Sequence, residues 1–280
     1  MTVTDKAFIM LDSIDILSEQ KFMWERRTII SQKMKQYARL ARVGLHIGEG
    51  FVLTVFSGAL FVPHKSFQQP VIQFWQKRFC QVMGIDITVH GQPDPRPALW
   101  VSNHVSWLDI PVIGANFPVY FLSKSEVSDW PVVKHLANAA GTLYIKRGSG
   151  EANGVANQIA SHLNVGRSVL FFPEGTTTDG KKLKRFFHKL FQAACMTGAD
   201  IQPVVLCYRD ENGELHAVAP FIGDDEFATH LMDVLKEKHI TVELLVLPRV
   251  SVNGRNERTL AKDIQIMMAD ALLKLQEGKI

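Results

Sequence analysis

Three classes of protein are disfavoured by what this sequence of 280 residues lacks. It contains three cysteines (Cys80, Cys195 and Cys207) and no Cys-x-x-Cys pair, so neither a disulfide framework nor a zinc ribbon is indicated. Its formal net charge of +3 is too small to indicate a nucleic-acid partner, and it has no zinc-finger or RNA-binding signature. We therefore expect reduced thiols, a cytosolic environment and no nucleic acid among the partners.

The N-terminal region lacks both a signal peptide and a long apolar run. The first twenty residues hold four acidic side chains and one lysine, whereas a signal peptide begins with a basic region. The apolar stretch 50–63 (GFVLTVFSGALFVP) is shorter than the roughly 20 residues that a spanning helix requires.

What the N-terminal region does contain is a basic stretch followed by this short apolar one. Seven Lys and Arg residues lie between 21 and 42, opposed by Glu25 alone. Cations beside a short apolar helix are typical of a segment lying in an anionic lipid surface, so we expect residues 21–63 to contact a membrane surface. The alternatives are a helix pair packed on a soluble core and a single true span.

Beyond Pro63 short apolar runs alternate with helical patterns. The runs are rich in Val, Ile, Phe and Tyr and are bounded by turn residues; they cover 87–91, 98–103, 119–124, 142–147, 168–175, 201–208, 215–220 and 242–247. Helical patterns cover 67–84, 107–116, 129–139, 151–164, 185–198 and 255–276. This alternation predicts an α/β fold, a central mixed sheet covered by helices. We expect an N-terminal helical arm over 1–64 and a second domain over 65–280.

Residues 103–109 read NHVSWLD and directly follow an apolar run. Ser106 and Asp109 match a helix capping box, in which Ser106 would cap the helix and Asp109 would reach back. With Asp109 in the first helical turn, its carboxylate could accept a hydrogen bond from His104 just before the helix. A histidine held in this way has a fixed tautomer and a free basic nitrogen. The spacing therefore predicts a His-Asp dyad.

No partner nucleophile accompanies this dyad in the sequence. There is no G-x-S-x-G elbow, no cysteine with a catalytic signature and no HExxH zinc motif. A base without a protein nucleophile must act on a substrate hydroxyl or on water, and we expect no metal ion.

Three further stretches follow the dyad: GTLYIKR (141–147), FFPEGTTTDG (171–180) with the basic run KKLKR (181–185), and IQPVVL (201–206). In this order and spacing the four stretches resemble the glycerolipid acyltransferase family, of the 1-acyl-sn-glycerol-3-phosphate acyltransferase (lysophosphatidic acid acyltransferase) type. The family pattern is NHxxxxD, then G-x-x-[FY]-I-x-R, F-P-E-G-[TS] and a V-P-V-like strand. The resemblance covers about residues 85–210, and four ordered motifs are specific where each alone is weak.

The resemblance implies a role for each matching residue. His104 would be the general base that takes the proton from the acceptor hydroxyl as it attacks an acyl thioester, and Asp109 would orient His104. Arg147 would hold an anionic headgroup, because a guanidinium can bind phosphate through two hydrogen bonds. The residues expected to bind substrate are Asn103, Lys146, Arg147, Glu174, Gly175 and Thr176. Arg147 as a surface cation and Glu174 as a turn acid remain alternatives.

The implied function is that of a membrane-associated O-acyltransferase. It would move a fatty acyl group from acyl-CoA or acyl carrier protein to the sn-2 hydroxyl of 1-acyl-glycerol-3-phosphate, giving phosphatidic acid, with no cofactor beyond the acyl donor. We expect it at the cytoplasmic face of the inner or plasma membrane, with a lysophospholipid as the lipid partner.

One position departs from this pattern. Thr177 stands where many lysophosphatidate enzymes carry Arg, so Lys182, Lys184 or Arg185 would have to compensate, or the acceptor has another headgroup. The stretches FPEGTTTDG and FFHKLFQAA (186–194) also look like those of lyso-ornithine lipid acyltransferases, which are the alternative within the class. A non-catalytic lipid-binding module and a thioesterase-like hydrolase are the alternatives of other classes.

Overall fold

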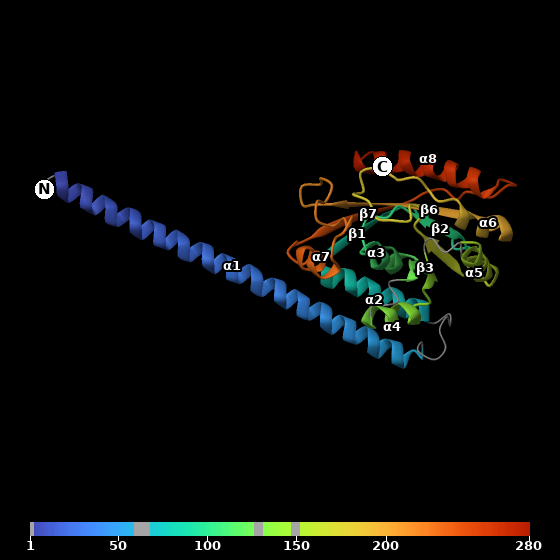
Figure 1. The fold of residues 1–280 in the computed structure, drawn as a ribbon, viewed down its shortest axis with the longest axis horizontal. Coiled ribbons are helices and arrows are strands. Elements are labelled where there is room, and N and C mark those ends of the chain that lie inside the picture. Colours follow the sequence, from blue (N-terminus) through green and yellow to red (C-terminus); the bar gives the residue numbers. More distant parts are fainter. Residues whose placement is uncertain (1–2, 59–67, 126–130, 147–151) are drawn as a thin grey trace.

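A computed structural model describes residues 3–58, 68–125, 131–146 and 152–280 (Figure 1). The elements are, in chain order, α1 (Val3–Phe56), α2 (Gln68–Met83), β1 (Ile85–His90), β2 (Leu99–Ser102), α3 (Asp109–Asn116), β3 (Val119–Lys124), α4 (Pro131–Ala139), β4 (Leu143–Ile145), α5 (Ala152–Asn164), β5 (Ser168–Phe171), the 3₁₀ helix η2 (Lys189–Phe191), α6 (Gln192–Thr197), β6 (Ile201–Arg209), α7 (Phe227–Val234), β7 (Ile240–Val246) and α8 (Glu257–Gln276). The predicted α/β class is confirmed.

The strands form one seven-stranded sheet in the order β1-β7-β6-β2-β5-β3-β4. Neighbouring strands run parallel except β6 and β7, which are antiparallel, so the sheet is mixed as predicted. Apolar side chains of α5, α6 and α8 cover one face, and those of α2, α3 and α7 cover the other (Figure 1). A central strand such as β6 is therefore buried on both faces, which explains its uninterrupted apolar sequence.

Two predicted elements differ from the structure, and one helix was not predicted. The run 215–220 is not a strand beyond a single bridge at Leu215, because the His216 ring accepts hydrogen bonds from the amides of Val218 and Ala219 and turns the chain. The pattern 185–198 is helical only from η2 onward. Helix α7 was not predicted.

Helix α1 is one continuous helix of 54 residues, about 81 Å long at 1.5 Å per residue. Its N-terminal part extends away from the sheet, whereas its C-terminal part packs beside α2 (Figure 1). There Arg39 donates hydrogen bonds to the carbonyls of Leu235 (2.9 Å) and Met83 (2.7 Å), and the His46 ring stacks on Trp75 at 4.9 Å. A side chain in place of Gly50 would collide with the Trp75 indole, so glycine permits this close approach.

The structure describes only residues 21–58 of the segment 21–63 that was predicted to contact a membrane. In the described part of the chain, no helix has a stretch long and apolar enough to cross a membrane. Residues 59–63 of the predicted arm and the predicted domain boundary at 64/65 lie outside the described residues.

Candidate active site

The predicted site residues follow strands whose carboxyl ends meet at one edge of the sheet. β2, β3, β4, β5 and β6 run in the same direction. β2 ends directly before Asn103 and His104, and its neighbour β5 ends directly before Phe172 and Glu174. In open α/β sheets this edge is where ligands bind.

The predicted dyad is formed. Nδ1 of His104 lies 2.7 Å from Oδ2 of Asp109, which is the first residue of α3 and is fully buried. The same oxygen accepts hydrogen bonds from the backbone amides of Val105 (2.8 Å) and Ser106 (3.1 Å). Asp109 therefore reaches back as a capping box requires. The predicted cap by Ser106 is wrong, because its buried hydroxyl has no hydrogen-bond partner within the described residues.

The geometry places the free nitrogen of His104 outward. Because an ionised carboxylate only accepts hydrogen bonds, we assign the ring proton to Nδ1, which leaves a lone pair on Nε2. Nε2 has no hydrogen-bond partner in the described part of the chain, and the side chain is 19% exposed. One face of the ring stacks on Phe172, with centroids 3.9 Å apart and planes 10° from parallel. The ring is thus held in place while its basic nitrogen stays available.

Tyr208 completes the surroundings of the carboxylate. Its hydroxyl donates a hydrogen bond of 2.6 Å to Oδ1 of Asp109. Burial, followed by the nearby Asp109 charge, raises the pKa of Tyr208 well above its ordinary value, so the hydroxyl stays protonated. Tyr208 was not predicted as a site residue. The only feature of the sequence that indicates it is the polar group at the end of the apolar run 201–208.

Glu174 connects two loops of the site. Its side chain is buried (2% exposed), and its two oxygens accept hydrogen bonds from the backbone amides of His104 (3.0 Å) and Lys184 (2.7 Å). Burial raises the pKa of Glu174, and the two amide hydrogen bonds oppose that rise. The next residue, Gly175, has φ +66°, and a Cβ there would meet the Phe187 ring at 3.0 Å. Glycine is required at this turn.

Two further residues fasten the backbone next to the dyad. Both polar atoms of the Asn103 side chain bond to the backbone of Leu206, at 3.0 and 2.9 Å, which continues the pairing of β2 with β6 past the strand end. The amide and hydroxyl of Thr178 donate to the carbonyl of His104, at 2.9 and 3.2 Å. Thr178 was not predicted. Thr176 is half-buried, and its predicted substrate contact stays a prediction.

Of the two adjacent cations predicted to bind substrate, the structure describes only Lys146, and it does not follow a strand next to β2. Lys146 follows β4, and β5 and β3 lie between β4 and β2, which separates the two strands by roughly 14 Å at about 4.8 Å per strand. Arg147 lies outside the described residues. Among the residues that the structure describes, no group of three or more His, Cys, Asp or Glu side chains is placed to hold a metal ion. The chemistry that the arrangement offers is proton removal by a partly exposed imidazole that a buried carboxylate holds in place.

Comparisons with known proteins agree with the predicted family. Residues 86–207 match the family model described as Acyltransferase. The chain is 41% identical over 198 residues to the lyso-ornithine lipid O-acyltransferase of Pseudomonas aeruginosa, a match that covers 71% of this chain and 76% of that protein. It is 34% identical over 163 residues to the 1-acyl-sn-glycerol-3-phosphate acyltransferase of Neisseria gonorrhoeae, covering 58% of this chain and 64% of that protein.

The fold also has a solved counterpart. The crystal structure of the 1-acyl-sn-glycerophosphate (LPA) acyltransferase PlsC from Thermotoga maritima superposes with a TM-score of 0.60 at 19% identity, covering 85% of this chain and 98% of that chain. The four ordered motifs, the fold and the relatives all agree. The chain belongs to the acyltransferase family and is an acyltransferase.

Proposed function

We propose that the protein transfers a fatty acyl group from a thioester donor, acyl-CoA or acyl carrier protein, to the free hydroxyl of lyso-ornithine lipid. The observation that carries the chemistry is the available Nε2 of His104, positioned by the buried Asp109. The choice of acceptor is supported by the relative that is 41% identical and by Thr177, which stands where many lysophosphatidate enzymes carry Arg.

1-Acyl-glycerol-3-phosphate, the acceptor placed first from the sequence alone, becomes the second candidate. It is favoured by the relative that is 34% identical and named for that acceptor. The product in that case is phosphatidic acid. An amino acid headgroup and a phosphate differ in charge, so one purified enzyme can be tested against both.

The proposed reaction needs no covalent enzyme intermediate. The acceptor oxygen attacks the thioester carbonyl carbon, and its proton passes to Nε2 of His104. A carbon–oxygen bond forms, the carbon–sulfur bond breaks, and the same proton passes on to the departing sulfur. Asp109 stabilises the transient imidazolium because its charge lies 2.7 Å from Nδ1 in a buried setting.

Tyr208 acts as a positioning residue in this mechanism. Its hydrogen bond to Oδ1 fixes the carboxylate plane, so that Oδ2 faces His104 and the two backbone amides together. Asn103 and Glu174 have the same kind of role, since both hold the backbone that carries His104. Their predicted direct contacts with substrate are not needed for the proposed reaction.

We propose that α1 places this site at a membrane surface, on the cytoplasmic face. Large apolar side chains on its described part are exposed, including Trp24, Ile30 and Met34, and Arg27 and Lys35 lie among them. Apolar side chains beside cations suit the boundary between headgroups and acyl chains of an anionic membrane.

The proposal is tested with the purified full-length chain in mixed micelles. Acyl-CoA and acyl carrier protein donors are each offered with lyso-ornithine lipid and with 1-acyl-glycerol-3-phosphate, and products are identified by mass. We expect thiol release that depends on the acceptor, with faster turnover of lyso-ornithine lipid. Faster turnover of the phosphate acceptor would overturn the choice of acceptor. Thiol release without any acceptor would indicate a hydrolase, and no turnover with any pair would contradict the proposed function.

A further inference from the structure

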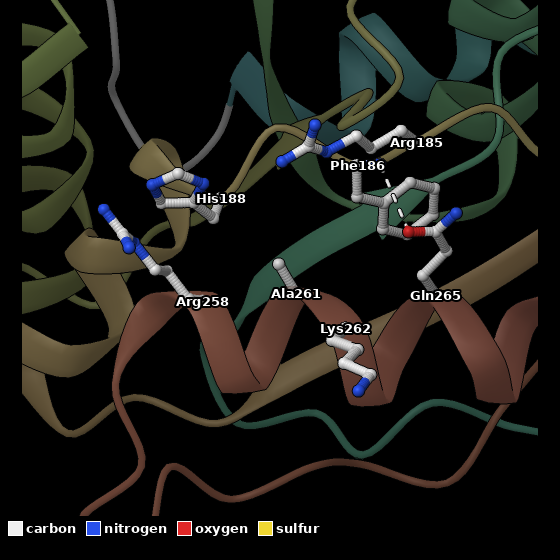
Figure 2. A pocket seen from close by; sticks show the side chains of 7 residues that line it. All are labelled: Arg185, Phe186, His188, Arg258, Ala261, Lys262 and Gln265. Carbon is white, nitrogen blue, oxygen red and sulfur yellow. Dashed lines mark hydrogen bonds between the residues drawn. The ribbon is translucent and has the colours of Figure 1, made fainter.

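A hollow of about 410 Å³ lies between the loop before η2 and the first half of α8. Figure 2 shows Arg185 and His188 on the loop and Arg258, Lys262 and Gln265 on the helix. His104 does not line this hollow, so it is separate from the dyad. None of the roles assigned above uses it.

The lining carries positive charge without a compensating acid. Arg185, Arg258 and Lys262 are exposed cations, and no carboxylate lines the hollow. In the described part of the chain none of the three forms an ion pair, although other cations near or on α8 do. Lys274, for example, lies 2.7 Å from Asp270. Arg258 and Lys262 are also four residues apart on one helix, a spacing at which like charges repel. An anionic ligand would relieve this repulsion.

The loop side of the hollow is held in place by protein contacts alone. The amide group of Gln265 accepts from the backbone amide of Phe186 (3.3 Å, dashed in Figure 2) and donates to the carbonyl of Lys184 (3.1 Å). Arg185 lies between Lys184 and Phe186 in the chain, so its backbone is anchored to α8. The spacing between the loop cations and the helix cations exists before any ligand binds, which lowers the ordering cost of binding.

Hydrogen bonds connect the loop beside the hollow to the reaction centre. Lys184, directly before Arg185, donates its backbone amide to Glu174 at 2.7 Å, and the other oxygen of Glu174 bonds to the amide of His104 at 3.0 Å. Phe187 donates to the carbonyl of Pro173 at 2.8 Å. One carboxylate thus links the backbone beside Arg185 to the backbone of the base.

The position of the hollow suits the donor better than the lipid acceptor. α8 covers the face of the sheet opposite to that covered by α2 and α7, whereas α1 packs against α2 and α4 and donates hydrogen bonds to the carbonyls of Met232 and Leu235, in and just after α7 (Figure 1). A lipid acceptor would arrive from the side of the membrane helix, whereas a water-soluble donor can arrive from the other side.

We propose that this cationic hollow binds the phosphate groups of a coenzyme A type acyl donor while its thioester arm reaches His104. The proposal rests on the proposed acyl transfer and adds the site that recognises the donor. Guanidinium groups suit phosphate oxygens because they donate paired, charge-assisted hydrogen bonds.

The first experiment compares two donors with the same thioester. Acyl-CoA carries phosphates, and the acyl thioester of N-acetylcysteamine carries none. For the double variant Arg185→Gln with Arg258→Gln we expect KM for acyl-CoA to rise about tenfold. KM for the truncated donor and kcat for both donors should stay unchanged. Lys274→Gln, also on α8 but outside the hollow, is the matched control and should leave every constant unchanged.

The second experiment measures binding without turnover. Adenosine 3′,5′-bisphosphate, which carries two of the three phosphates of coenzyme A, is titrated into the full-length wild type and the double variant by calorimetry. We expect binding that weakens with salt and is lost in the variant.

The outcomes separate this proposal from the proposed function. Unchanged KM for acyl-CoA together with unchanged bisphosphate binding would overturn the donor site and leave acyl transfer intact. If acyl carrier protein is offered as a third donor in the first experiment, a rise in KM confined to that donor would also overturn the proposal and would make the hollow a protein docking surface. Loss of bisphosphate binding in the variant would support the donor site even if no acceptor were acylated.

Discussion

The dyad and the cationic hollow both depend on charged side chains, but the charged groups of the dyad are held by internal contacts and those of the hollow are exposed. Asp109 is fully buried and accepts four hydrogen bonds, from a histidine, a tyrosine and two backbone amides. The cations of the hollow, Arg185 and Arg258 among them, are exposed and have no ion-pair partner in the described residues. The charged group of the dyad is therefore paired within the protein, whereas the cations of the hollow are exposed to solvent.

The difference follows from what each region must do. A buried carboxylate with hydrogen bonds at both oxygens keeps the imidazole in one orientation, and a fixed, desolvated charge acts more strongly than one in water. A binding surface for an exchangeable polyanion must instead stay hydrated and unpaired until the ligand arrives. Substitutions at the dyad should therefore reduce kcat, whereas those in the hollow should change KM for the donor.

The largest effect is expected at the base itself. His104→Ala should lower kcat by about 10²–10⁴-fold, the usual contribution of a general base, and should leave the free energy of unfolding nearly unchanged because the ring lies at the sheet edge. Steady-state kinetics and chemical denaturation measure the two quantities. His239→Ala, at a histidine whose side chain is 72% exposed, is the matched control. Wild-type kcat in His104→Ala would end the assignment of the base.

Glu174→Gln should lower stability as well as rate. An amide accepts on one side only, so its NH₂ group would face one of the two backbone amides, at a cost of about 1–3 kcal/mol. The raised pKa of Glu174 sets the sign of the pH dependence. The fold favours the protonated carboxyl, so the contribution of Glu174 to stability is complete below its ordinary pKa and is lost as pH rises through the raised one.

Gln does not titrate, so the destabilisation caused by Glu174→Gln should be smaller at about pH 8 than at about pH 5. Denaturation of both proteins at the two pH values measures the difference, with Glu277→Gln at an exposed acid directly after α8 as the control. A loss that grows with pH would contradict the burial of Glu174.

Tyr208→Phe should have a smaller effect that is confined to the dyad. Removing the hydrogen bond to Asp109 should lower kcat about tenfold with KM for both substrates unchanged, since a bond to a charged group contributes about 1.5–3 kcal/mol. A merely structural role would lower stability and leave kcat unchanged.

The smallest effect at neutral pH is expected from the two buried thiols, which lie in the core on opposite faces of the sheet. Burial raises the pKa of Cys80 to about 12 from 9.0 and that of Cys207 to about 11 from 9.0. The fold therefore favours the neutral thiols, and their contribution to stability is complete below about pH 9 and is lost as pH rises toward these values.

The slope of unfolding free energy above about pH 9 should be about 1.4 kcal/mol per pH unit for each thiol. Cys80→Ala should remove one such contribution, although it lowers stability at neutral pH by leaving a small cavity. Equal slopes in the wild type and Cys80→Ala would contradict the burial of this thiol.

Most of the catalytic centre could be predicted because its parts are local in the chain. His104 and Asp109 are five residues apart, at a strand end and a helix start, and both positions were recognisable from apolar periodicity. Lys146 was harder to place. Its motif also ends a parallel strand, but which strands lie side by side is set by crossovers that periodicity does not report, and β4 is at the far edge.

The sequence by itself determined the fold class, the order of the motifs, the family and the dyad, because those depend on residue type and short-range spacing. Only the tertiary structure decided that Tyr208 bonds to Asp109 and that Arg185 faces Arg258. The first pair is separated by 99 positions. Such pairs are brought together by the order of the strands and by the packing of α8 on the sheet. Both are driven by the burial of apolar area and not by the pairing of these particular side chains. The partners can therefore be identified only from the assembled fold.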